Sequence, residues 1–272
     1  MTRTSPMSSP TPPRGGFLRR LMWTSQVARA QRQSMLETSR PTVIAVAALD
    51  NRMLTTPTSA LIGLILEEVS ELSVALIEGD TVAQPLRSSV DARSNGDLFG
   101  LVSCPHEGIT RAAIESFTDT SGGVPVVSAQ PGNTLRLLPE HLDVLVPRAQ
   151  HRWPMIILDL PFTVAPETIA AGTALASHVV LIADRYHRNH DWLYQPGHHL
   201  SALARDGKVT VACIGGQPSG LLQDTVALPV VDAQSTSHSR LVPSTRPRDI
   251  AMYYRLLARI FAESVHSDPR PR

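Results

Sequence analysis

The chain has 272 residues, which is enough for one large α/β domain with a full core. Its formal net charge of +1 argues against a general affinity for nucleic acid, and no apolar run reaches the ~18 residues of a membrane-spanning helix. Residues 1–16 lack the apolar core of a secretory signal, and Cys104 and Cys213 are too few for a disulfide framework. We therefore expect a cytoplasmic protein.

Positive charge gathers at the start of the chain. Residues 1–40 hold seven arginines and one acid, which leaves 18 basic and 23 acidic residues in the rest. Residues 1–16 are rich in Ser, Thr and Pro, a composition that predicts a disordered leader. The positive charge is confined to this segment, and the sequence has no extended row of basic residues that could follow a phosphate backbone. We therefore do not expect a nucleic-acid partner.

Residues 17–40 are predicted to form a basic amphipathic helical segment. Such a helix lies on an anionic membrane, docks on a partner or packs against its own domain, and the sequence leaves these three alternatives open. The first alternative makes residues 17–36 a peripheral contact with the inner face of the plasma membrane. The residues predicted to make a membrane or partner contact are Phe17, Arg19, Arg20, Leu21 and Trp23.

Continuous apolar runs alternate with helix-like segments from residue 41 onwards, and such runs predict strands buried on both faces of a sheet. The predicted strands are 42–49, 73–80, 124–130, 154–161, 178–184, 208–216 and 226–232. The predicted helices are 58–70, 110–117, 137–145, 167–177 and 248–264. This alternation predicts an α/β domain over 41–265, with one doubly wound, mostly parallel sheet and helices on both faces. A disordered tail is expected at 266–272.

The turn after the first predicted strand has the frame of a phosphate-binding loop. Residues 49–56 read "LDNRMLTT". In a working loop, glycines let backbone N–H groups approach the phosphate, and a lysine neutralises it. The order of parts resembles the deviant-Walker P-loop ATPases of the MinD/ParA family, whose loop reads "KGGVGKTT". The departures from that motif are Leu49, Asp50, Asn51, Arg52, Met53 and Leu54, and only Thr55 and Thr56 agree with it.

The resemblance continues at three later strand ends. "VALIEGD" places Glu78 and Asp80 where the family has its second-strand acids, and "IILDLP" places Asp159 at the Walker B acid. The family's adenine-reading asparagine falls on Ile214 in "VACIGGQP". By the same resemblance, Thr55 stands at the hydroxyl that ligates Mg²⁺. The carboxyl ends of parallel strands meet at one edge of a sheet, so these residues are expected to lie close together.

The segment "GFLRRLMW" at 16–23 is similar to one that precedes the ATPase domain in actinobacterial MinD-like proteins associated with type VII (ESX) secretion. The resemblance implies a protein partner, which would be an active paralogue or the secretion machinery, and a homo- or heterodimer. The alternatives are a weak ATPase in cargo, chromosome, plasmid or septum positioning and a partition accessory.

The loop residues predict a nucleotide site that has lost its function. The only lysine of the chain is Lys208, and an acid, Asp50, stands where a phosphate would bind. Each lost charged hydrogen-bond partner costs ~1.5–3 kcal/mol, and bulky Met53 and Leu54 block the close approach that glycine permits. We therefore expect a pseudo-ATPase with no catalytic residue and no cofactor, or ATP and Mg²⁺ if Arg52 substitutes for the lysine.

The retained residues also have structural interpretations. Thr55 and Thr56 suit a helix N-cap, and Asp159 can accept bonds from nearby groups. Glu78 and Asp80 are expected to be solvated if they bind no metal.

Two further groups of residues are candidate sites. The segment 186–199 contains four histidines, His187, His190, His198 and His199. It has three possible interpretations: a metal site, a surface for a partner, or an exposed loop with Trp192, Leu193 and Tyr194 packed inward. The sequence offers too few carboxylates there, and we expect no metal. Cys104 and His106 resemble a thiol–base pair without a third, orienting group.

Overall fold

The computed structural model describes residues 41–49, 55–69, 73–93, 96–216, 224–231, 236–237 and 240–266. The predicted leader and the predicted basic segment, including its membrane or partner residues, lie outside these ranges. Loop residues Asp50, Asn51, Arg52, Met53 and Leu54 also lie outside them. Within the described ranges, no helix combines the length and the apolar character needed to cross a membrane.

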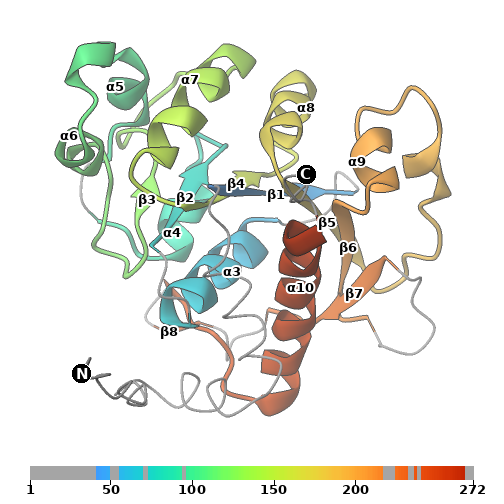
Figure 1. The fold of residues 1–272 in the computed structure, drawn as a ribbon. Coiled ribbons are helices and arrows are strands. Elements are labelled where there is room, and N and C mark those ends of the chain that lie inside the picture. Colours follow the sequence, from blue (N-terminus) through green and yellow to red (C-terminus); the bar gives the residue numbers. More distant parts are fainter. Residues whose placement is uncertain are drawn as a thin grey trace, which may run out of the picture.

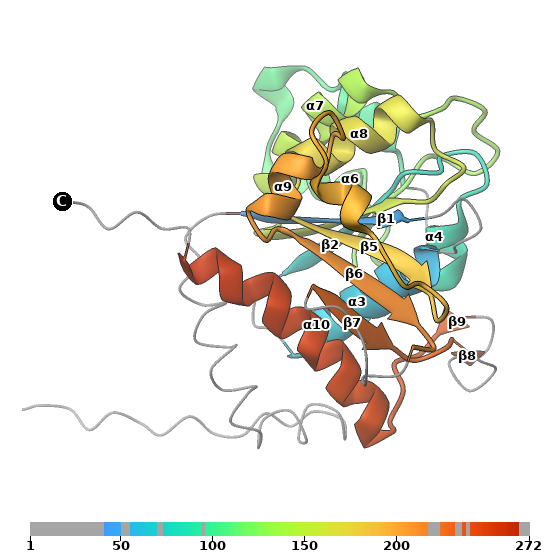
Figure 2. The ribbon, with the colours of Figure 1, turned by 90° about the vertical axis from the view of Figure 1, so that its right-hand side faces the viewer.

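One seven-stranded sheet forms the centre of the molecule, with the strand order β3-β2-β4-β1-β5-β6-β7. Its strands are β1 (Thr42–Ala48), β2 (Val74–Glu78), β3 (Val126–Val127), β4 (Met155–Leu160), β5 (His178–Asp184), β6 (Val209–Ile214) and β7 (Thr225–Leu228). Every neighbouring pair is parallel, and the arrows of β1, β5 and β6 point towards one edge in Figure 2. The predicted doubly wound sheet is confirmed, and it is parallel throughout.

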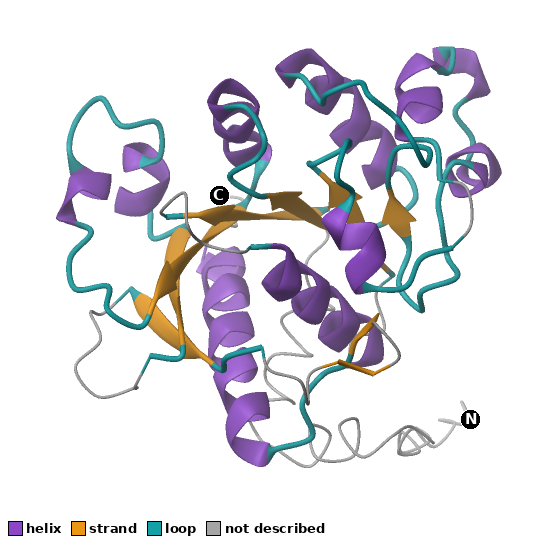
Figure 3. Cartoon of the chain, turned by 180° about the vertical axis from the view of Figure 1, so that it is seen from behind, coloured by secondary structure: helices purple, strands orange, loops and turns teal. Residues whose placement is uncertain are grey.

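Helices cover both faces of this sheet (Figures 1 and 3). One layer contains α3 (Thr56–Val69), α4 (Pro85–Ser89) and α10 (Pro247–His266). The other contains α5 (Leu98–Ser103), α6 (Arg111–Ser116), α7 (Pro139–Gln150), α8 (Pro166–Leu175) and α9 (Ser201–Arg205). Two 3₁₀ turns, η1 (His106–Gly108) and η2 (Asp191–Tyr194), and a short antiparallel pair, β8 (Thr236–Ser237) and β9 (Arg240–Leu241), complete the described elements.

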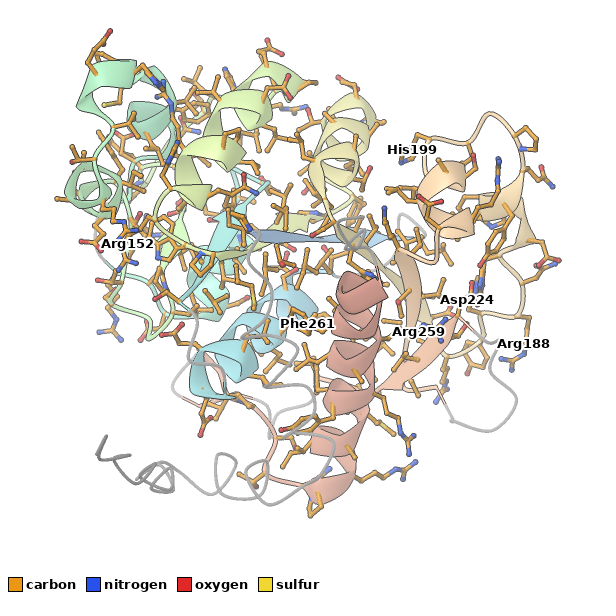
Figure 4. All side chains as sticks on the ribbon, viewed as in Figure 1. Arg152, Arg188, His199, Asp224, Arg259 and Phe261 are labelled. Atoms are coloured by element: carbon orange, nitrogen blue, oxygen red, sulfur yellow. The ribbon has the colours of Figure 1, made fainter. Side chains whose placement is uncertain are left out.

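The sheet divides the core into two apolar clusters, because alternate side chains of each strand point to opposite faces. Ile44 and Val46 of β1 face the α3 and α10 layer, where Phe261 of α10, labelled in Figure 4, is 1% exposed. Val43 and Ala45 face the other layer, which contains Trp153. Both faces of the central strands are therefore buried from solvent, as their uninterrupted apolar runs predicted.

Several boundaries differ from the sequence-based prediction. The third strand is only Val126–Val127, and it lies at the edge of the sheet, where it pairs with β2. The helix predicted to end at residue 145 continues through Pro147 to Gln150, held by a buried apolar face. Helices α4, α5 and α9 were not predicted, since each is too short to show a helical period.

Strand β1 lies between β4 and β5, which places it where the direction of winding reverses. The chain leaves β1 for α3 on one face and leaves β4 for α8 on the opposite face (Figure 1). In open parallel sheets, this reversal opens a crevice beyond the carboxyl ends of the strands, where ligands bind. The predicted phosphate-loop remnant and the predicted acids are found at this edge.

Candidate functional site: the carboxyl edge of strands β1, β2 and β4

The predicted loop remnant joins β1 to α3 at the point of reversal. The N–H of Leu49 donates to the carbonyl of Ile182 at 2.9 Å, and the next described residue is Thr55. The carbonyl of Thr55 accepts the N–H groups of Thr58 at 2.9 Å and Ser59 at 3.1 Å, which starts α3. The hydroxyl of Thr55 is buried beside Asp159, where it joins the hydroxyls of Ser59 and Thr56 in lowering the pKa of that acid.

Asp159, the predicted Walker B acid, is tied to helix α3. Its Oδ2 accepts the hydroxyl of Thr56 at 2.7 Å, and its Oδ1 accepts the hydroxyl of Ser59 at 2.6 Å. The side chain has no exposed surface. Burial raises the pKa of Asp159 to about 6, against the hydrogen bonds from Ser59 and Thr56, which favour the carboxylate. The two hydroxyls therefore occupy both carboxyl oxygens and pin the start of α3 to the end of β4.

Glu78 ends β2 directly beside Asp159 in the sheet. Its Oε1 accepts the backbone N–H groups of Leu86 at 2.6 Å and Arg87 at 3.3 Å, while its buried Oε2 has no partner among the described residues. The side chain is fully buried, so the expectation that Glu78 is solvated was wrong. Burial raises its pKa to about 8, and the negative charges of Asp159 and Asp80 act in the same direction.

The close approach of β2 and β4 explains the glycine that follows Glu78. The N–H of Gly79 donates to the carbonyl of Asp159 at 2.9 Å. A Cβ atom at position 79 would lie 2.2 Å from that carbonyl oxygen, so only glycine fits there. The two acids are therefore held side by side by backbone geometry.

Asp80 is half-buried and links two loops at the same edge. Its Oδ1 accepts the N–H groups of Val82 at 3.2 Å and Ala83 at 2.9 Å, and its Oδ2 accepts the hydroxyl of Thr163 at 2.6 Å. Beside it is an open hollow of about 190 Å³, lined by residues 79–83, 136–137 and 163–165. Asp80 therefore organises one wall of this hollow.

The remaining predicted positions contribute little to a nucleotide site. Ile214 ends β6 and packs, partly buried, against the apolar core, so its side chain offers no hydrogen bond to a base. Lys208 precedes β6 and therefore lies at the amino edge of the sheet, opposite the carboxyl ends of the strands. Its Nζ is 3.5 Å from Oδ2 of Asp206.

Among the described residues, this edge of the sheet holds two buried acids and no lysine. The only ammonium side chain of the chain is at the opposite edge, and burial raises the pKa of both acids. Oε2 of Glu78 is a buried acceptor at this site that has no partner among the described residues. The residues that sequence reasoning missed are Ser59, Arg136 and Thr163. Ser59 alone had a signal, since it lies one helical turn after Thr55 and Thr56.

The histidine-rich segment forms a hydrogen-bonded chain next to β7. Nε2 of His187 lies 2.8 Å from Nδ1 of His190, whose Nε2 lies 2.6 Å from Oδ2 of Asp224. The hydroxyl of Tyr194 donates to the same oxygen at 2.6 Å. Burial opposes the ionised form of Asp224, but the hydrogen bonds from His190 and Tyr194 outweigh it and lower its pKa to about 2. Asp224 lies on the β7 side of the molecule (Figure 4).

The structure of residues 186–199 can be compared with the three interpretations of this segment. No group of three potential metal ligands is found in the described part of the chain. Leu193 is buried as expected, but Trp192 and Tyr194 are 39% and 38% exposed, so their predicted inward packing was wrong. Tyr194 faces Asp224 instead, because its hydroxyl needs a partner.

The all-parallel sheet with helices on both faces defines a doubly wound α/β fold. Similar solved structures are the ParA-family ATPase of Chlorobium tepidum TLS (TM-score 0.53, 11% identity, 84% of this chain and 99% of that chain) and an McdA variant of Cyanothece in complex with ATP (0.54, 13%, 86% and 100%). A third is a putative plasmid partition protein of Borrelia burgdorferi B31 bound to AMPPNP (0.53, 9%, 85% and 100%). No family model and no curated protein matches the sequence. The chain therefore has the ParA/MinD-type fold.

Proposed function

We propose that this chain is a ParA/MinD-like pseudo-ATPase that acts by binding, as a non-catalytic accessory or regulatory subunit. The observation that carries the proposal is the position of Lys208, the only lysine, at the edge of the sheet opposite the loop. A polyphosphate at residues 49–56 would therefore meet no ammonium group. It would also lie near Glu78 and Asp159, which are buried and, among the described residues, accept hydrogen bonds from hydroxyl and backbone N–H groups.

The magnitude of the loss supports the same proposal. Two lysine contacts to phosphate, at ~1.5–3 kcal/mol each, correspond to ~3–6 kcal/mol. That free energy is a factor of roughly 10²–10⁴ in affinity. A nucleotide that an intact loop binds at about 1 μM would then bind only at roughly 0.1–10 mM.

The proposed partner rests on the resemblance of residues 16–23 to a segment of known proteins. "GFLRRLMW" at 16–23 is similar to the segment of ESX-associated MinD-like proteins, so we place this chain with type VII secretion machinery or with an active paralogue. A homo- or heterodimer is part of this proposal. We further propose a cytoplasmic protein that contacts the inner face of the plasma membrane through residues 17–36.

A second candidate function is a weak nucleotide-binding ATPase in the positioning of cargo, chromosomes, plasmids or septa. The buried hydroxyl of Thr55, beside Asp159, favours it, because the resemblance makes this oxygen the Mg²⁺ ligand. Arg52 would then take the role of the missing lysine.

Equilibrium dialysis of the full chain against a radiolabelled ATP analogue, with and without Mg²⁺, tests the proposal. We expect no saturable binding below about 0.1 mM. Asp159→Asn is the control variant, because a genuine Mg²⁺-dependent site would lose affinity with this change while adventitious binding would not. Micromolar, Mg²⁺-dependent binding that Asp159→Asn abolishes would overturn the pseudo-ATPase proposal and establish the second candidate.

A further inference from the structure

Exposed apolar residues occur in the three segments that line the hollow beside Asp80. Among the described residues, four of the eight exposed large apolar side chains belong to these segments or directly adjoin them in the chain: Val82, Leu135, Leu138 and Phe162, which are 50%, 60%, 39% and 47% exposed. Val82 lines the hollow itself, and the other three adjoin its lining residues in the chain. We call these four side chains, together with Arg136, the carboxyl-edge surface. Scattered single apolar residues need no explanation, but a cluster around a hollow marks a binding surface.

Three loops that carry this surface are hydrogen-bonded together. The hydroxyl of Thr81 donates to the carbonyl of Leu135 at 2.6 Å, which joins the loops after β2 and β3. The amide of Asn133 adds a bond to the carbonyl of Thr81 at 3.1 Å. The hydroxyl of Thr163 donates to Asp80, which joins the loop after β4. The surface is therefore held in shape before a partner arrives, which reduces the entropic cost of binding.

Backbone strain is present in the same loop. Gln84 has φ 51° and ψ 51°, a left-handed conformation that non-glycine residues rarely adopt. Its side-chain amide donates to the carbonyls of Gln130 at 2.8 Å and Thr81 at 3.3 Å, which hold it there. Strain of this kind persists where the surrounding structure fixes it, and it concentrates at functional sites.

The charges around the hollow indicate the chemistry of the occupant. Arg136 is exposed and has no ion pair with any described residue, while Asp80 already accepts three hydrogen bonds. Among the lining residues, a free positive charge therefore stands beside apolar side chains with no free carboxylate. An arginine flanked by exposed apolar groups is typical of a protein–protein hot spot.

We propose that the carboxyl-edge surface binds a protein partner through a segment that places apolar side chains next to carboxylates. The apolar side chains fill the hollow and contact Leu135 and Phe162, and a carboxylate pairs with Arg136. A second copy of this chain fits poorly, since a symmetric contact would bring no free carboxylate from its own hollow to Arg136. One arginine is too little charge for a nucleic acid or an anionic membrane.

This inference rests on the proposed binding function and names the chemistry of its partner. The test is selection of a phage-displayed random 12-residue peptide library on the full chain, with fluorescence anisotropy of the selected peptides. We expect peptides that combine glutamate or aspartate with leucine or aromatic residues. Arg136→Glu and the double variant Leu135→Ser/Phe162→Ser should each weaken their binding at least about tenfold, as loss of a hot-spot contact does.

Matched controls separate this surface from others. Val230→Ser removes an equally exposed apolar side chain after β7, and Arg188→Glu reverses an exposed arginine elsewhere, so neither should change the affinity. A lysine-for-glutamate version of a selected peptide should bind Arg136→Glu better than the unchanged chain. Circular dichroism confirms that every variant is folded.

Several outcomes would overturn the proposal. Peptides that bind the control and surface variants alike would place the contact elsewhere. Sedimentation equilibrium showing a dimer that Phe162→Ser disrupts would assign the surface to a second copy. If the full-length double variant Phe17→Ser/Trp23→Ser binds the peptides more strongly than the unchanged chain, the occupant of the carboxyl-edge surface would be the chain's own segment 17–40. None of these results changes ATP affinity, so failure here is distinguishable from failure of the pseudo-ATPase proposal.

Discussion

The buried acid Glu78 gives the sharpest stability prediction. Its pKa is raised from 4.5 to about 8, because burial disfavours the carboxylate. The folded protein thus keeps a proton that the unfolded chain releases above pH 4.5. The contribution of Glu78 to the free energy of unfolding is therefore fully present below pH 4.5 and is lost as pH rises towards 8.

Replacing Glu78 with Gln removes this penalty. Gln keeps an oxygen for the N–H groups of Leu86 and Arg87, and its amide NH₂ replaces the protonated oxygen that has no partner. At ~1.36 kcal/mol per pKa unit, Glu78→Gln should stabilise the protein by about 2–4 kcal/mol at pH 7, and by little at pH 4.5.

Urea unfolding at pH 4.5, 6, 7 and 8 measures this difference, with the fluorescence of the buried Trp153 as one reporter. The gap in midpoint between Glu78→Gln and the unchanged chain should widen with pH. Glu107→Gln makes the same chemical change at an exposed position and should give a constant, small gap. A gap for Glu78→Gln that is independent of pH, or a loss of stability at pH 8, would refute the reasoning.

Three further predictions concern side chains with defined partners. Thr56→Val removes a hydroxyl that donates to buried Asp159 at 2.7 Å and should lower the free energy of unfolding by about 1–3 kcal/mol. Urea midpoints measure this loss, and a midpoint equal to that of the unchanged chain would contradict it. Burial lowers the pKa of His178 from 6.5 to about 4, so its contribution to the free energy of unfolding is fully present above pH 6.5 and should fall by about 3 kcal/mol towards pH 4. His178→Gln should therefore make the free energy of unfolding depend less on pH between 6.5 and 4. The same pH dependence in this variant and in the unchanged chain would contradict the prediction. Asp224→Asn weakens the bonds to His190 and Tyr194 and should speed hydrogen exchange of the Leu193 N–H, while Asp191→Asn, at an exposed position, should not.

The strands could be predicted because burial on both faces leaves a direct trace in the sequence. The run 178–184 matches β5 residue for residue, since every position but the last is buried. The short helices left no such trace. Helix α4 has five residues and begins with Pro85, and its start depends on Glu78 accepting two N–H groups rather than on any local period.

The site could be predicted only in part for a related reason. The acids Glu78 and Asp159 were located by their positions at strand ends, and the fold brings them together as expected. Their burial was not foreseen for Glu78, because it depends on β3 and β4 lying on either side of β2. The bond from Ser59 to Asp159 joins residues 100 positions apart, and only the completed sheet creates it.

A crystal structure grown with Mg²⁺ and AMPPNP tests the central claim most directly. The account predicts no nucleotide density at residues 49–56 and Asp159 still accepting the hydroxyls of Thr56 and Ser59. A triphosphate bound across that turn, with the Thr55 hydroxyl on the magnesium ion, would contradict it.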